Sequence, residues 1–244
     1  MALFTDGPAS TIEDLAAQDS QLLNIASAEG VDLTVKLGLE QEAIGLEVEE
    51  LLQRGSSFRL SQVVVTPALR LWHTYRTLEL VYRDAYHSQL NDRYAGKRDQ
   101  FRELSKWAYD RLIQAGIGIA VRPVPRAATP RVSQTTGQLS DGLYYVTMAW
   151  MNEAGECGAC ANPETITVAG GGFQVEPQAP SRGVTGWNVY AGFGPDAMWQ
   201  QNVDPIAPDA PWMQIGLWLS NEVLANGGQS ANYFHAIPRV LQRG

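Results

Sequence analysis

The chain has 244 residues, of which 45% are hydrophobic, a formal net charge of −8 and a mean hydropathy of −0.18, values ordinary for one or two globular domains. It contains no run of about eighteen apolar residues, so we expect no membrane span. Residues 1–8 lack the basic start and apolar core of a secretory signal, so we expect synthesis in the cytoplasm.

The charge is unevenly distributed along the chain. Residues 1–60 hold eleven acidic and three basic side chains, a net charge of −8. Residues 61–126 hold six acidic and eleven basic ones (+5), and residues 127–244 hold nine and four (−5). A basic middle can contact nucleic acid or can bind an acidic patch of another copy. Because nucleic-acid-binding proteins are usually basic overall, we favour self-association.

Residues 10–30 carry the pattern of a first helix. Ser10 and Glu13 have the spacing of a capping box, and Gly30 is a typical helix stop. The expected buried residues are Ile12, Leu15, Ala16, Leu22 and either Leu23 or Ala26.

A second helix is predicted over residues 32–53. Gly38 and Gly45 weaken it by about 1 kcal/mol each relative to Ala. Its apolar face consists of Leu33, Leu37, Ile44, Val48, Leu51 and Leu52. Its other face carries Glu40, Glu42, Glu47, Glu49 and Glu50.

Two further helices follow. Thr66 and Pro67 form a typical helix start, and an apolar and aromatic stripe continues from it through Leu71, Trp72, Tyr75, Leu78, Tyr82 and Tyr86. The last helix lies between Gly96 and Gly116, with Phe101, Leu104, Ala108 and Leu112 buried. Because the connections are short, we predict an antiparallel helix bundle over residues 1–120.

The second half reads as β structure, which makes the predicted fold class α+β. Residues 121–138 are predicted to be a linker, since three prolines within residues 123–130 disfavour a helix. Residues 139–225 are predicted to form a β-sandwich-like domain. Its clearest strands are residues 143–151, bulky on both faces, and residues 185–193. Residues 226–244 are predicted to be a C-terminal tail that orders on a partner.

No group of residues resembles a catalytic, metal or cofactor site. Cys157 and Cys160 form a CxxC pair without a second pair of soft ligands or a thioredoxin-like context. His73 and His87 accompany no nucleophile or metalloprotease motif, and residues 170–172 lack the Lys-Ser/Thr of a phosphate loop. We therefore expect no catalytic residues, no metal and no cofactor.

On these features the chain resembles the head-to-tail connector proteins (adaptor or head-completion proteins) of tailed bacteriophages. The helical resemblance covers residues 10–120 and rests on the Tyr- and Arg-rich helices at 72–89 and 93–115, with the segment LELVYRDAY at 78–86. Residues 142–156 (GLYYVTMAWMNEAGE) and 183–192 (GVTGWNVYAG) look like the fibronectin-III or immunoglobulin-like modules of virion proteins. Connector proteins are commonly small and all-helical, so the β module would be an addition to that family.

The resemblance implies a structural protein in the neck of the virion. It would form a ring of about twelve copies below the portal protein, contact tail or neck proteins, and let double-stranded DNA pass without sequence recognition. The implied contacts between copies join Glu40, Glu42, Glu47, Glu49 and Glu50 of one copy to Arg93, Lys97, Arg98, Arg102 and Lys106 of the next. The implied partner-docking residues of the tail are Phe234, Ile237, Val240 and Leu241.

Two other functions remain open on the sequence. The chain could be another neck or tail protein, or an adhesion protein whose immunoglobulin-like module binds a surface or a neighbouring virion protein. It could also be an enzyme with acidic catalysis through Glu153, Glu156 or Glu164. We rank the connector first and the enzyme last.

Overall fold

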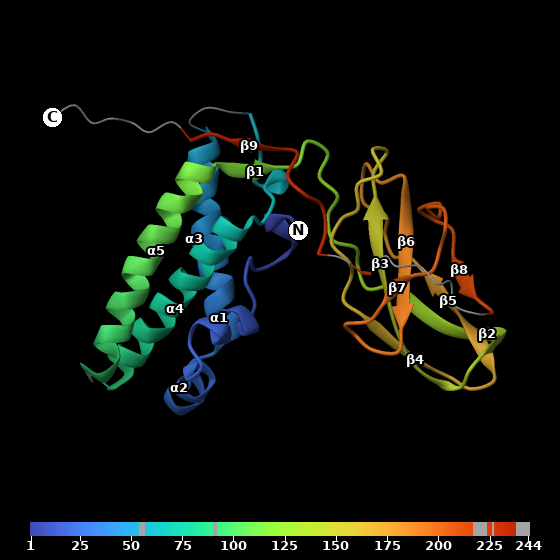
Figure 1. Cartoon of the computed structure of the whole chain (residues 1–244), viewed down its shortest axis with the longest axis horizontal. Coiled ribbons are helices and arrows are strands. Elements are labelled where there is room, and N and C mark those ends of the chain that lie inside the picture. Colours follow the sequence, from blue (N-terminus) through green and yellow to red (C-terminus); the bar gives the residue numbers. More distant parts are fainter. Residues whose placement is uncertain (54–56, 90–91, 217–223, 226, 238–244) are drawn as a thin grey trace. The chain divides into compact units, whose positions relative to one another are not determined.

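The structure, a computed structural model, describes residues 1–53, 57–89, 92–216, 224–225 and 227–237. Helices form its N-terminal part and antiparallel sheets its C-terminal part, so the predicted α+β class is confirmed (Figure 1). The α-helices are α1 (Ile12–Gln18), α2 (Leu22–Glu29), α3 (Leu33–Gln53), α4 (Pro67–Gln89) and α5 (Ala95–Ala115). The 3-10 helices are η1 (Phe4–Asp6), η2 (Leu60–Gln62) and η3 (Asp92–Tyr94). The strands are β1 (Ile117–Ile119), β2 (Arg131–Leu139), β3 (Gly142–Met151), β4 (Glu164–Val168), β5 (Gly171–Glu176), β6 (Gly186–Gly192), β7 (Trp199–Gln200), β8 (Trp212–Gln214) and β9 (Tyr233–His235).

The chain divides into two compact units. Gly7–Val121 and Ala231–Gly244 form one, here called the helical unit. Met1–Asp6 and Arg122–Ser230 form the other, the β unit. The start of the chain belongs to the β unit, where Leu3 and Phe4 are buried and Asp6 accepts a hydrogen bond from the backbone N–H of Arg126 (2.9 Å).

The single helix predicted over residues 10–30 is instead two helices. Thr11, one residue after the predicted cap Ser10, caps α1 and forms a capping box with Asp14. The chain leaves the helix at Asp19, whose backbone is extended and whose carboxylate accepts a bond from the backbone N–H of Gln21. The break turns the Asp19 side chain into the interior. Gly30, with φ +67°, ends α2 as predicted.

The longer helices begin and end close to the predicted residues. Asp32 accepts bonds from the backbone N–H groups of Thr34 and Val35 at the start of α3, and the predicted apolar face of this helix is buried. Thr66 accepts a bond from the N–H of Leu69 as α4 begins at Pro67. Gly116, with φ +86°, ends α5.

The core of the helical unit forms where α4 packs against both α3 and α5 (Figure 1). Tyr82 of α4 stacks on Phe101 of α5 with ring centroids 5.6 Å apart. Trp72 and Tyr109 make a second contact between these helices at 5.1 Å. None of the described helices is long and apolar enough to cross a membrane.

Residues 233–235, placed in the predicted tail, form β9 and pair antiparallel with β1. The register sets Ile117 opposite His235 and Ile119 opposite Tyr233. The side chain of Asn232 also accepts a bond from the backbone N–H of Val121 (2.7 Å). The pairing closes the helical unit with a segment more than 100 residues away in sequence, which local patterns do not reveal.

The β unit contains two antiparallel sheets with strand orders β2-β5-β8 and β4-β3-β6-β7. Tyr144 and Trp150 of β3, Phe173 of β5 and Trp187 of β6 are buried in one cluster shared by both sheets. The other face of β3 is partly covered, since Ala149 packs with Tyr190 and Met198. The expectation that both faces of this strand are covered holds for its second half, whereas Leu143 near its start is exposed.

Residues 131–138, placed in the linker by the sequence, form most of β2. The prolines end at Pro130, and the strand starts at the next residue. Val132 pairs with Val175, but most of β2 is exposed, which explains why its pattern is weak.

Candidate functional site on the helical unit

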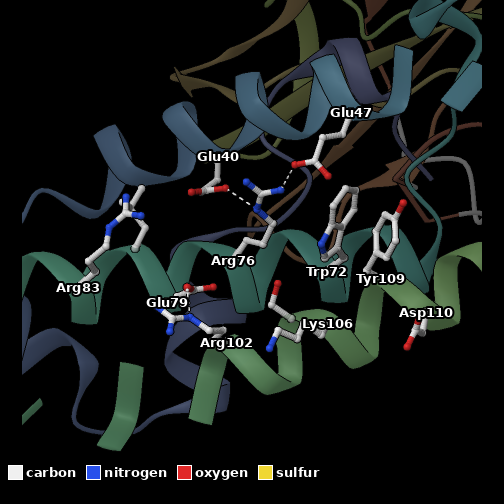
Figure 2. Close-up of a pocket in the computed structure, with 12 residues that line it drawn as sticks. Glu40, Glu47, Trp72, Arg76, Glu79, Arg83, Arg102, Lys106, Tyr109 and Asp110 are labelled. Atoms are coloured by element: carbon white, nitrogen blue, oxygen red, sulfur yellow. Dashed lines mark hydrogen bonds and ion pairs between the residues drawn. The ribbon is translucent and has the colours of Figure 1, made fainter. Parts of the chain in front are cut away.

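The predicted acidic and basic sets meet in part at a cleft of about 560 Å³ formed by α3, α4 and α5 (Figure 2). Glu40 and Glu47 reach it from α3, and Arg102 and Lys106 reach it from α5. Glu79, Arg83 and Asp110 add three more charged side chains. The cleft therefore brings together members of both sets that the sequence singled out.

Arg76 of α4 organises the acidic side of this cleft. Its Nε lies 2.8 Å from Oε2 of Glu40 in an ion pair, and its Nη1 donates a hydrogen bond to Glu47. Its guanidinium carbon also lies 5.5 Å from the centre of the Trp72 ring. Figure 2 shows this side chain pointing from α4 towards both glutamates. Both carboxylates are thus engaged within their own chain, not free for a partner's basic residue.

Glu40 is the most buried carboxylate lining the cleft. Burial raises the pKa of its carboxyl above the ordinary value, and the positive charges of Arg76 and Arg83 offset this effect only in part. Its Oε2 has the Arg76 ion pair but no hydrogen bond of good geometry within the described residues. Arg76 thus makes the ion pair with this carboxylate, and Arg83 adds a second positive charge that acts on it.

The basic residues of α5 are engaged within the chain as well. Arg102 donates to Glu79 (3.0 Å), and Lys106 pairs with Glu103 (2.7 Å). Arg98 pairs with Asp99 next to it (2.8 Å). These pairs are exposed or half-exposed, so each contributes little stability and can exchange for a contact with a partner.

Lys97 serves a buried site away from the cleft. Its Nζ lies 2.8 Å from Oδ2 of Asp19, which also accepts a bond from the hydroxyl of Tyr82 at 2.6 Å. Burial acts to raise the pKa of Asp19, but the bonds from Lys97, Tyr82 and the N–H of Gln21 outweigh it, so the net shift is downward. Lys97 is therefore a structural residue of the helical unit.

None of the remaining predicted residues within the described part of the chain lines this cleft. Glu42, Glu49 and Glu50 are exposed on α3, and Arg93 is exposed with its guanidinium 5.4 Å from the Tyr94 ring. Phe234 is half-exposed in β9, and Ile237 follows it, partly buried. Val240 and Leu241 lie outside the described residues.

Two features of the helical unit were not expected from the sequence: the role of Arg76 and the pair formed by Ser10 and His73. Arg76 lies three residues before Glu79 and four after Trp72, an ordinary pattern for an exposed helix face that carries no signal of a role. The Ser10–His73 pair has the contact of a nucleophile and its base, but both side chains are buried and closed to a substrate.

The residues of the acidic-catalysis hypothesis belong to the β unit. Glu153 pairs with Arg122, and Glu156 accepts bonds from the side-chain amides of Asn152 and Gln229 (both 2.8 Å). Glu164 is exposed at the start of β4. Within the described part of the chain, no three His, Cys, Asp or Glu side chains are grouped as a metal site would need.

Comparison with models of known protein families gave no match, and comparison with curated proteins gave none either.

Proposed function

We propose that this chain is a structural protein of a tailed-phage virion that acts as a head-to-tail connector. In this role copies assemble into a closed ring below the portal, join the capsid to the tail and surround the path of the DNA. The chemistry is mechanical and needs no catalytic residue or cofactor. The helical unit supplies the contacts between copies, and the β unit supplies contacts to neck or tail proteins.

The observation that carries the proposal is that two helices of the helical unit differ in charge: α3 is mainly acidic, and α5 has more basic than acidic residues. Helix α3 holds five glutamates and one lysine, whereas α5 holds five basic and three acidic residues. Both helices pack on α4, and each keeps an outer face exposed. Two different faces on one compact unit, one strongly acidic and one with a small excess of basic residues, favour a head-to-tail interface, the kind that generates a ring when the rotation closes.

The β unit supports the immunoglobulin-like part of the proposal through its strand neighbours. In immunoglobulin-like sandwiches a tyrosine near the start of strand F donates its hydroxyl to a backbone carbonyl a few residues upstream, and strand C carries a buried tryptophan. Here Tyr144, near the start of β3, donates to the carbonyl of Ser140 (2.6 Å), and β6 carries the buried Trp187. With β3 as F and β6 as C, β4 next to β3 corresponds to G.

The other sheet agrees with this assignment. β2 precedes the tyrosine and corresponds to strand E, and its neighbour β5 corresponds to B. β8 lies on the far side of β5, where strand A would pair. These neighbours support an immunoglobulin-like sandwich in which the chain would run through E, F, G, B and C and then A.

Imaging of the purified full-length protein tests the proposal. Negative-stain electron microscopy is expected to show rings with an axial opening and a cyclic symmetry near twelvefold. Particles of single-chain size at every concentration would contradict it.

A second function, contact of the β unit with a surface or a neighbouring virion protein, is favoured by its exposed apolar side chains. Phe193 is more than half exposed, although its ring lies 4.9 Å from that of Tyr144, and Val203 is more exposed still. The full chain and its Phe193→Ser variant can be compared for binding to host cells. If the full chain and the Phe193→Ser variant bind host cells equally, or if neither binds, Phe193 has no role in surface contact.

A further inference from the structure

Helix α3 has two opposite apolar faces, of which the unit covers only one. Leu37, Ile44 and Val48 point into the helical unit and are buried. On the other side Val35 and Leu39 are about half exposed, and Leu46 is 71% exposed, the most of any leucine within the described residues. The three follow one another at spacings of four and seven residues, so they lie in one line along the helix.

Acidic residues complete this line. Positions 35, 39, 42, 46 and 49 alternate spacings of four and three, the pattern of a helix seam that receives a second helix. Glu42 and Glu49 occupy the two remaining positions and are exposed. Two α3 seams placed against each other would bring these carboxylates together, which disfavours pairing of α3 with itself. The seam instead suits a partner face that is apolar at its centre and basic at its edge.

Gly38 lies at the edge of the same seam and carries a second indication of a close neighbour. A glycine inside a helix costs about 1 kcal/mol relative to alanine. Nothing within the described part of the chain demands it, since a Cβ at Gly38 would have no atom within 4 Å. The glycine leaves a flat place on the helix surface that a partner helix can approach.

Helix α5 offers an exposed tryptophan with a basic residue, Arg111, on one side and the exposed acidic residues Glu103 and Asp110 on the other. Trp107 is 45% exposed and points away from Phe101, Ala108 and Leu112, which pack into the unit. The guanidinium of Arg111 lies 5.5 Å from the centre of the Trp107 ring, one turn along the helix. An exposed tryptophan beside an arginine is a frequent anchor of protein interfaces.

We propose that the seam of α3, formed by Val35, Leu39 and Leu46 with Glu42 and Glu49, docks on the Trp107–Arg111 face of α5 in a second copy of the chain. This inference rests on the proposed ring and names the surface that builds it. Because the two faces differ, each copy uses α3 towards one neighbour and α5 towards the other.

The experiment blocks each face separately in the full chain. The double variant Leu39→Gln, Leu46→Gln removes the apolar part of the seam without adding charge, and Trp107→Gln removes the anchor on α5. Leu23→Gln on α2 is the matched control, since Leu23 is also an exposed helical leucine (53%) but lies outside the seam. Circular dichroism confirms that each variant keeps its helices, and light scattering gives its mass.

Each blocked variant alone is expected to have the mass of one chain, 26.7 kDa, and the control is expected to assemble like the wild type. An equimolar mixture of the two blocked variants is expected to form a dimer of about 53 kDa, because one intact α3 face still meets one intact α5 face.

Three results would overturn the inference. If the wild type assembles and both blocked variants do too, the surface is wrong while the ring stands. If only one of the two variants fails to assemble, α3 and α5 do not bind each other. A wild type of single-chain mass at all concentrations would remove the inference and the proposed ring together.

Discussion

The hydroxyl of Ser10 lies 2.6 Å from Nδ1 of His73, so the segment that precedes α1 is joined to the middle of α4. The other ring nitrogen, Nε2, lies 3.2 Å from the carbonyl oxygen of Leu37 in α3. A carbonyl can only accept, so Nε2 carries the proton and Nδ1 accepts from Ser10. One neutral imidazole thus connects three parts of the helical unit.

This arrangement makes the helical unit sensitive to acid. Burial lowers the pKa of His73 to about 4, below the 6.5 of an exposed imidazole. Between these values the unfolded chain binds a proton that the folded chain does not, so stability falls as pH falls from about 6.5 to about 4. The loss attributable to His73 is about 3 kcal/mol over this range.

Urea unfolding followed by circular dichroism at 222 nm, at several pH values, measures this loss. His73→Leu is expected to lower the free energy of unfolding at pH 7 and to flatten its dependence on pH. His87→Gln, at an exposed position, is expected to leave the wild-type pH dependence unchanged. The raised pKa of Glu40 acts in the opposite direction, and the difference between wild type and His73→Leu cancels it. Equal slopes for these two proteins would show that His73 does not titrate as described.

Asp19→Ala is expected to destabilise the helical unit by about 2 kcal/mol, because the Tyr82 hydroxyl loses its acceptor and Lys97 its counter-ion. Asp99→Ala breaks exposed pairs with Arg98 and Arg102 and is expected to cost under about 0.5 kcal/mol. Thermal unfolding at 222 nm compares the two. If the two variants lose similar amounts of stability, the burial of Asp19 does not strengthen its interactions.

The sequence predicted those features of the helical unit that depend on neighbouring residues. Thr66 with Pro67 marks the start of α4, and Gly30 and Gly116 mark the ends of α2 and α5, because capping and positive φ are local requirements. The break at Asp19 brings its carboxylate instead to Lys97, 78 residues later in the sequence. No local pattern contains that contact.

The candidate site was predicted only in part for the same reason. The sequence shows which residues are acidic and which are basic. It does not show which of these side chains are exposed and which are engaged inside the helical unit. Arg76, from a helix between the two, draws Glu40 and Glu47 inward and leaves Glu42 and Glu49 exposed. The pairing of β9 with β1 was also hidden, since strands of three residues carry little pattern of their own.

Tyr144→Phe tests the strand assignment in the β unit. The ring keeps its place against Phe173, and the bond to the Ser140 carbonyl is lost, so we expect a loss of about 1 kcal/mol. Tyr145→Phe, on the partly exposed opposite face of β3, is expected to change stability by less than about half of that. Tryptophan fluorescence during urea unfolding is the readout, and equal effects would argue against a tyrosine corner.

Gly192→Ala is expected to destabilise the β unit by about 3 kcal/mol or more. A Cβ at this end of β6 would overlap the carbonyl oxygen of Ala197, which belongs to the backbone and cannot move aside cheaply. At Gly194, two residues later, a Cβ meets nothing within 4 Å, so Gly194→Ala is expected to stay within about 0.5 kcal/mol of wild type. Urea unfolding of both variants measures the difference, and similar stabilities would contradict the close approach of Ala197 to Gly192.

The mass of the wild-type protein in solution tests the connector account most directly. Multi-angle light scattering at low salt is expected to give about 320 kDa, twelve chains of 26.7 kDa, with partial dissociation at about 1 M salt because screening weakens contacts between charged faces. A mass of 26.7 kDa that does not change with concentration or salt would contradict the account.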